Sequence, residues 1–212
     1  GIGAYALDAA LTGNDNTAVG NEAGSSVTSG ANNTAVGGYA LRYTTTASNN
    51  TALGKSALTA NTTGANNTAV GKDALQQNTT ASYNSAFGVG SLQTNTTGTT
   101  NTAVGYQSLT ANTTAANNTA IGNQSLGSNT TGAQNIAVGG RSLYTNTTTN
   151  NNTAVGYDAL YTNAASNNTA VGRDSSKANT TGTLLVSVGA YSLTANTTGI
   201  RNTALGYESM SA

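Results

Sequence analysis

The chain has 212 residues, seven basic and seven acidic side chains, and no histidine, cysteine, proline or tryptophan. The absence of His and Cys excludes Ser-His and Cys-His catalytic triads, thiolate chemistry and zinc sites built from nitrogen and sulfur ligands. A net charge of zero without a basic run argues against nucleic acid as a partner, and no stretch approaches the ~20 apolar residues of a membrane span.

A glycine recurs through the whole chain at an interval of 17 residues, with a single step of 16 between Gly156 and Gly172. Asn163 keeps its offset from Gly156, so the missing residue falls in the connection after this Asn, which we expect to be a surface turn. A period of this length is typical of stacked repeats. The composition would also fit a disordered low-complexity chain. A disordered chain does not need a constant repeat length, however, and this sequence keeps one.

Each glycine ends a short phrase of the type Asn-Thr-Ala-Val-Gly, which reads as a strand bounded by glycine. We therefore predict an all-β parallel β-solenoid of about thirteen 17-residue coils, in which residues 1–212 form a single repeat array. Strands stacked at ~4.8 Å would give a rod about 60 Å long. The following glycines are expected to have a positive φ at a corner of the coil: Gly20, Gly37, Gly54, Gly71, Gly88, Gly105, Gly122, Gly139, Gly156, Gly172, Gly189 and Gly206.

Two apolar columns are expected to form the core. One is the bulky residue before each glycine, as in Val19, and the other is the residue four positions after it, usually Leu. The second column has exceptions at Gly24 and Ser176.

Two further columns hold only small residues: Ala, Gly or Ser two positions before the glycine, and Ala or Ser three positions after it. Because side chains alternate along a strand, an inward Val19 would place Ala18 on the outside. An outward column closed to large residues implies a close neighbour, and a thin core would gain from association. We therefore expect a homo-oligomer, most simply a homotrimer.

An Asn column runs unbroken from Asn61 through Asn78 and Asn95 to Asn196. It is interpreted either as a ladder whose amides bond between coils or as a series of turn formers. Both interpretations lead to the same fold.

The phrase around Val70-Gly71, Val104-Gly105, Val155-Gly156 and their equivalents resembles the head repeats of trimeric autotransporter adhesins, and also the repeats of bacteriophage tail fibres and other bacterial surface fibres. The resemblance covers the whole chain. It implies a left-handed parallel β-roll with three chains around a common axis, outside the cell or on a virion, that acts as a rigid stalk or an adhesive head. The adhesin repeat is usually shorter, so the loop Asn-Thr-Thr-Gly is an addition.

The columns one, two and five positions after the glycine vary, and they hold nearly all the charge and most of the tyrosine. They are interpreted as an exposed face that is either only solvated or binds a surface glycan or lipopolysaccharide through amphipathic rings. The candidate ligand-binding residues are Tyr106, Tyr144, Tyr157, Asp158, Tyr161 and Tyr207. No cofactor, metal site or catalytic residue is expected.

Several other functions are less well supported. Ice binding is the alternative function, but a flat ice-binding face would need Thr-x-Thr in every coil, and Thr-Asn-Thr occurs only at residues 94–96 and 145–147. Calcium-binding rolls need a recurring acidic phrase, and an enzyme would need paired carboxylates. Because Gly1 opens within a repeat, without an initiator Met or signal peptide, we interpret the chain as a segment of a longer fibre protein that could also stack end to end.

Overall fold

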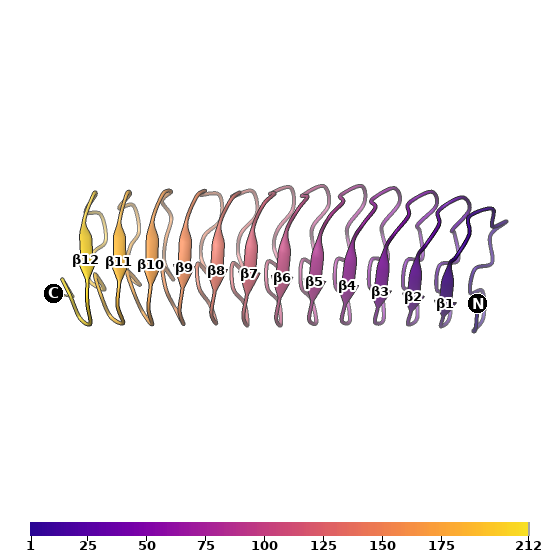
Figure 1. Ribbon diagram of the computed structural model, residues 1–212, viewed down its shortest axis with the longest axis horizontal. Helices are drawn as coiled ribbons and strands as arrows, with labels where there is room; N and C mark the ends of the chain where they lie inside the picture. The colour runs from indigo at the N-terminus through magenta and orange to yellow at the C-terminus, as the bar shows by residue number, and fades with distance from the viewer. Residues whose placement is uncertain (212) are drawn as a thin grey trace.

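A computed structural model describes residues 1–211. Twelve three-residue strands form one parallel sheet in chain order, so each strand pairs only with the strands of the coils before and after it (Figure 1). The strands are β1 (Thr17–Val19), β2 (Thr34–Val36), β3 (Thr51–Leu53), β4 (Thr68–Val70), β5 (Ser85–Phe87), β6 (Thr102–Val104), β7 (Thr119–Ile121), β8 (Ile136–Val138), β9 (Thr153–Val155), β10 (Thr169–Val171), β11 (Val186–Val188) and β12 (Thr203–Leu205). The predicted all-β solenoid is confirmed.

The number of coils is slightly smaller than thirteen. The twelve strands span about 11 turns, and the first glycine phrase adds only an isolated parallel bridge between Ile2 and Val19. Within the described chain there is no helix with the length and hydropathy that a bilayer crossing requires.

The strand register is unchanged across the coil that is one residue shorter than the others. Thr153 pairs with Thr169 just as Thr17 pairs with Thr34. The shorter connection therefore lies after Asn163, where Ala164 is exposed, and the predicted surface turn is confirmed.

The corner glycines have φ between 118° and 136°, as expected. Space as well as backbone conformation requires glycine here. A Cβ placed on Gly37 would lie 2.6 Å from the carbonyl carbon and oxygen of Gly54, one coil further on. Neither atom can swing away, because both belong to the backbone of the next corner.

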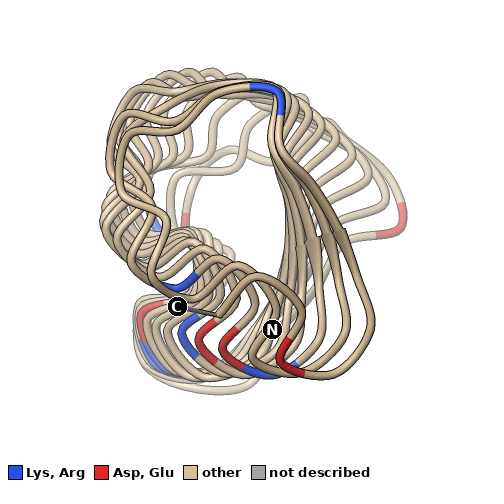
Figure 2. Cartoon of the chain, turned by 90° about the vertical axis from the view of Figure 1, so that its left-hand side faces the viewer, with Lys and Arg blue, Asp and Glu red and all other residues tan. Residues whose placement is uncertain are grey.

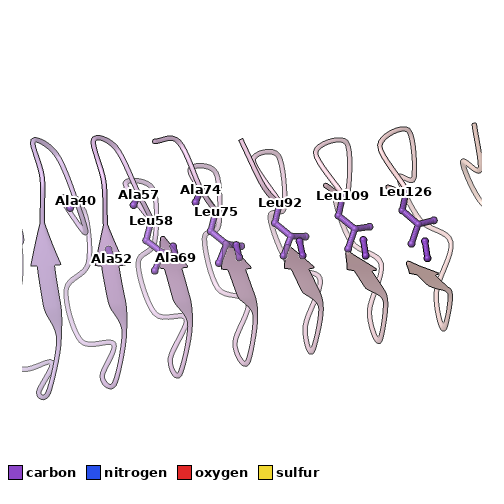
Figure 3. Close-up of a cluster of buried hydrophobic side chains, with 14 of the residues drawn as sticks. Ala40, Ala52, Ala57, Leu58, Ala69, Ala74, Leu75, Leu92, Leu109 and Leu126 are labelled. Atoms are coloured by element: carbon purple, nitrogen blue, oxygen red, sulfur yellow. The ribbon is translucent and has the colours of Figure 1, made fainter. Parts of the chain in front are cut away.

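The interior is filled by leucine and alanine. Leu58, Leu75, Leu92, Leu109 and Leu126 form a row along the axis, and alanines of the two small columns lie beside them (Figure 3). All five leucines are fully buried. The predicted leucine column is confirmed as core.

The other half of the predicted core is wrong. Val19, Leu53 and Phe87, each directly before a corner glycine, are 36–42% exposed, while Ala52 and Ala86 beside them are fully buried. A coil of only 17 residues encloses a narrow space, and one Leu together with small side chains fills it. The strands therefore turn alanine inward and the bulky residue outward.

The second small column is also internal. Ala57, Ala74, Ser91 and Ser108, three residues after their glycines, are fully buried. The prediction that the small columns face a neighbouring chain is therefore wrong. Their small size reflects the narrow interior of the coil and carries no information about a partner.

The two coils without the usual leucine each contain a substitute. Gly24 lies beside Val27, because a Cβ on Gly24 would be 3.6 Å from a Val27 methyl group, and Val27 is buried. In the coil of Ser176, Leu185 is buried at a position where most coils have Asn. The Oγ of Ser176 has no hydrogen-bond partner. Each coil thus keeps about one large apolar side chain inside.

Two asparagine ladders, both buried, bind the coils together. In the predicted one, Nδ2 of Asn78 donates to Oδ1 of Asn61 at 2.9 Å and also to the carbonyl of Ala81 at 2.9 Å. The same side-chain amide therefore bonds to the neighbouring coil and also stabilises the turn of its own coil. The sequence analysis missed the second ladder, in which the backbone N–H of Asn84 donates to Oδ1 of Asn67 at 2.9 Å.

Candidate ligand-binding surface

The segment that follows each corner glycine, here called the post-glycine turn, is residues one to five after that glycine. Seen along the axis, the strands form one wall, and most charged segments gather along the lower edge of the rod, on the post-glycine turns (Figure 2). The strands themselves contain no charged residue. The glycine corner thus separates an uncharged wall from a strip that carries most of the charge.

Three of the predicted tyrosines lie together in this strip. The rings of Tyr144 and Tyr161 stack with centroids 5.5 Å apart and an interplanar angle of 12°. The guanidinium of Arg141 lies 5.1 Å from the ring centroids of both Tyr157 and Tyr161. Cation–π contacts at such distances stabilise exposed clusters by ~0.5–1 kcal/mol. The stacked rings cover each other, so Tyr144 and Tyr161 are partly buried.

Asp158 does not lie on an exposed face, as the sequence analysis expected, and this prediction is wrong. Its side chain is 1% exposed and is held by two cations. Arg141 donates Nε to Oδ1 at 2.9 Å and Nη2 to Oδ2 at 2.6 Å, and Nζ of Lys177 lies 3.0 Å from Oδ2. A buried carboxylate needs such partners, so Asp158 is a structural anion rather than a ligand contact.

The ion pairs continue into the next coil. Nζ of Lys177 also donates to Oδ1 of Asp174 at 2.9 Å, and Nε of Arg173 donates to Oδ2 of the same carboxylate at 3.2 Å. The hydrogen bonds that Arg141 donates to Asp158 raise the pKa of Arg141, and hydrogen bonds to Asp174 and Asp158 raise the pKa of Lys177. Both shifts favour the charged forms of Arg141 and Lys177.

Arg141 and Lys177 were not among the predicted site residues. Arg141 and Asp158 occupy the same column one coil apart, so opposite charges at an offset of one period could have indicated the pair. Lys177 does not follow that rule, because it lies five residues after its glycine, three positions beyond the column of Asp158, and from there it contacts carboxylates of two coils.

Tyr106 and Tyr207 lie outside the ion network but share the column of Tyr157, directly after the corner glycine. Tyr106, Tyr157 and Tyr207 are 49%, 48% and 69% exposed. The ring of Tyr207 meets that of Tyr191 edge to face at 6.0 Å, and a hydrogen bond with Glu208 raises the pKa of the Tyr207 hydroxyl. Two distinct arrangements thus exist: a packed cluster around Arg141 and a spaced row of open rings.

A second surface comes from the sheet. The outer wall is the outward side of the strands, with one row of mostly Thr at their first residues and one row of Val, Leu, Ile or Phe at their last. This surface was not predicted from the sequence, because the apolar row was expected in the core. Among residues 1–211, no group of three or more acidic side chains is placed to hold a metal ion.

No protein family model, curated protein or solved structure matches the chain.

Proposed function

We propose that the chain is a segment of a rigid fibre outside the cell, in which three copies associate through their outer walls and form a stalk or an adhesive head. The elongated rod, with the chain termini at opposite ends, supports a spacer role (Figure 1). The resemblance to trimeric adhesin heads and tail fibres supports the number of copies and the location.

The observation that carries self-association is the outer wall. Twelve strands spaced ~4.8 Å apart extend over ~53 Å, and two rows ~7 Å apart cover roughly 370 Å² without a charge. About half of this area is apolar, and the largest exposed apolar patch of a protein is often a functional surface. A second copy has the same coil spacing, so its apolar row matches this one over the whole length.

The corner glycines leave the two surfaces free for separate roles. Association through the outer wall keeps the post-glycine turns at the outside of the assembly, because those turns lie around the corner from the wall (Figure 2). A fibre built in this way has a neutral interior interface and displays its variable columns to the surroundings.

Sedimentation equilibrium tests the proposal. The expected mass is about 63 kDa, three times the 20.9 kDa of one chain. Replacing Val104, Ile121 and Val138 with Lys should release monomers. The matched control replaces Thr97, Thr114 and Thr131, an exposed column away from the wall, with Lys and should leave the mass unchanged. A monomeric unmodified chain contradicts self-association.

The Thr row of the same wall favours ice binding as a second candidate function. Thr and apolar side chains alternate on the outward side of nine strands, from Thr17 to Thr203, at a fixed spacing. This Thr-x-Val array differs from the Thr-x-Thr pattern sought in the sequence. Thermal hysteresis measured on the monomeric fraction separates the two functions, because a wall buried in a trimer has no surface for ice.

A further inference from the structure

The post-glycine turns carry a feature that a stalk does not need, namely a regular row of exposed tyrosines. Tyr106, Tyr157 and Tyr207 occupy one column, and each lies three coils from the next. Coils at ~4.8 Å place these rings ~14 Å apart along the axis. All three rings are about half exposed or more.

One of the three rings packs against the backbone of the preceding coil. The position one coil earlier in the column is Val89 for Tyr106, Gly140 for Tyr157 and Ala190 for Tyr207, so no charged side chain precedes any ring. A Cβ on Gly140 would lie 3.2 Å from Cδ2 and 3.4 Å from Cε2 of Tyr157, so this ring lies over the glycine.

Neighbouring groups further restrict two of the rings. Arg141 lies 5.1 Å from the centroid of the Tyr157 ring, and Tyr191 contacts Tyr207 edge to face. Rings that are held in place before binding lose little side-chain entropy when a ligand arrives.

The cations near the row are each in contact with a carboxylate. Arg141, Lys177 and Arg173 all contact Asp158 or Asp174. Between Tyr106 and Tyr157 the column holds only Asn123 and Gly140, and in the adjacent column Nε2 of Gln124 donates to Oε1 of Gln107 at 3.2 Å. The stretch between Tyr106 and Tyr157 thus offers rings, amides and backbone, which suit an uncharged ligand rich in hydroxyl groups. Between Tyr157 and Tyr207 the column holds Ala190 and Arg173, which contacts Asp174.

We propose that this row binds a linear, uncharged polysaccharide that lies parallel to the solenoid axis, with a sugar ring on each of Tyr106, Tyr157 and Tyr207 and hydroxyl groups near the amides between Tyr106 and Tyr157. The proposal rests on the proposed adhesive role and names its ligand class. A single sugar reaches one ring only. A stiff polymer with its own repeat engages all three, and weak contacts then add up across rings and copies.

The experiment is affinity electrophoresis and pull-down of the full chain with soluble β-1,4-glucan, β-1,4-mannan and xyloglucan, with polygalacturonate as the charged comparison. Tyr157→Ala should weaken binding about five- to tenfold, and Tyr106→Ala with Tyr157→Ala more strongly, because a lost stacking contact is worth ~1 kcal/mol. The controls are Tyr43→Ala and Tyr83→Ala, exposed tyrosines outside the column, which should change nothing.

A spacing variant tests the regular row itself. Tyr157→Asn combined with Asn123→Tyr keeps three rings in the column but moves the middle one by two coils. This variant should lose as much affinity as Tyr157→Ala, and long chains should compete far better than disaccharides. If the spacing variant binds as tightly as the unmodified chain, or if disaccharides compete as well as long chains, the ligand is not an extended polymer and the proposal is overturned.

The sedimentation mass of the same preparation separates this proposal from the previous one. A trimer that binds none of the three neutral polymers overturns the polysaccharide track and leaves the fibre intact. A monomer that binds them through the three tyrosines overturns self-association and supports the track. Binding to polygalacturonate alone contradicts the uncharged ligand.

Discussion

Two adjacent glycines allow the corner geometry to be tested within one coil. Gly37 has φ 129°, and a Cβ there would lie 2.6 Å from the Gly54 carbonyl and 3.0 Å from the N of Lys55. Gly38 has an ordinary φ, and its nearest neighbour would be the Asn21 carbonyl oxygen at 3.9 Å. The same added methyl group is therefore blocked at one position and free at the next.

The expected magnitudes differ accordingly. In Gly37→Ala, a residue with a Cβ in this φ region costs about 1–3 kcal/mol. Forcing the next coil away costs about 1–3 kcal/mol more, as for overpacking. The unfolding free energy should fall by about 2–6 kcal/mol. Gly38→Ala restricts only the unfolded chain and should be neutral or stabilise by up to about 1 kcal/mol.

Urea denaturation followed by far-UV circular dichroism measures both variants. Hydrogen exchange at the amide of Gly54, which donates to the Val36 carbonyl at 2.8 Å, reports the local effect between these coils. Equal loss of stability in the two variants, or none in Gly37→Ala, would refute the close approach of successive corners.

Four other changes test the interior and the ion network. Ala103→Gln places a long amide inside the coil and should abolish the β-signal in circular dichroism; a folded variant contradicts the inward orientation. Leu185→Asn should lower the unfolding free energy by about 2–4 kcal/mol, and adding Ser176→Leu should recover part of it, whereas additive losses in a denaturation cycle contradict compensation. Leu184→Asn should stabilise by about 0.5–1 kcal/mol in urea denaturation, because Leu184 has φ 58° and Asn tolerates this region better. Lys177→Met should lower the denaturation midpoint by an amount that is constant up to about pH 10 and shrinks above 10.5. The reason is that the pKa of Lys177 is raised in the folded state, so its ion pairs are lost only when the pH rises through the folded-state pKa. A difference in midpoint that grows with pH contradicts the pairing.

The period was sufficient to predict the solenoid, the corner glycines and the first asparagine ladder. A repeat of constant length leaves few ways to stack strands, and a glycine without exception in one column indicates a position that no side chain can occupy. The surface turn after Asn163 followed from the same register. These predictions depend on position in the period alone.

The direction of the side chains could not be predicted in this way. Thr-Ala-Val alternates equally well with Ala inside or outside, and the usual preference for burying the larger apolar residue favoured Val19 and its equivalents. The narrow interior reverses that preference. Buried Val27 and Leu185, which replace a missing leucine within their own coils, are sequence signals that point to the true interior column.

The candidate site was predicted in part for a related reason. Variable columns identified the post-glycine turn, and Tyr144, Tyr157 and Tyr161 do lie together. The burial of Asp158 depends on Arg141 and Lys177, which reach it from neighbouring coils. Ion pairs between coils can be predicted from the sequence only when residues in neighbouring coils are compared for opposite charge.

The direction of the hydrogen bonds determines how a single chain would respond to tension. The termini lie at opposite ends of the rod, and bonds such as Leu58 N–H to the Ala74 carbonyl join successive coils along the line between them (Figure 1). A pull on both ends loads the bonds of one coil at a time, beginning at the terminal coils. Each detached coil of 17 residues extends from ~4.8 Å to ~58 Å. An isolated rod that resists bending would therefore lengthen stepwise at a nearly constant force and absorb mechanical work before its inner coils open.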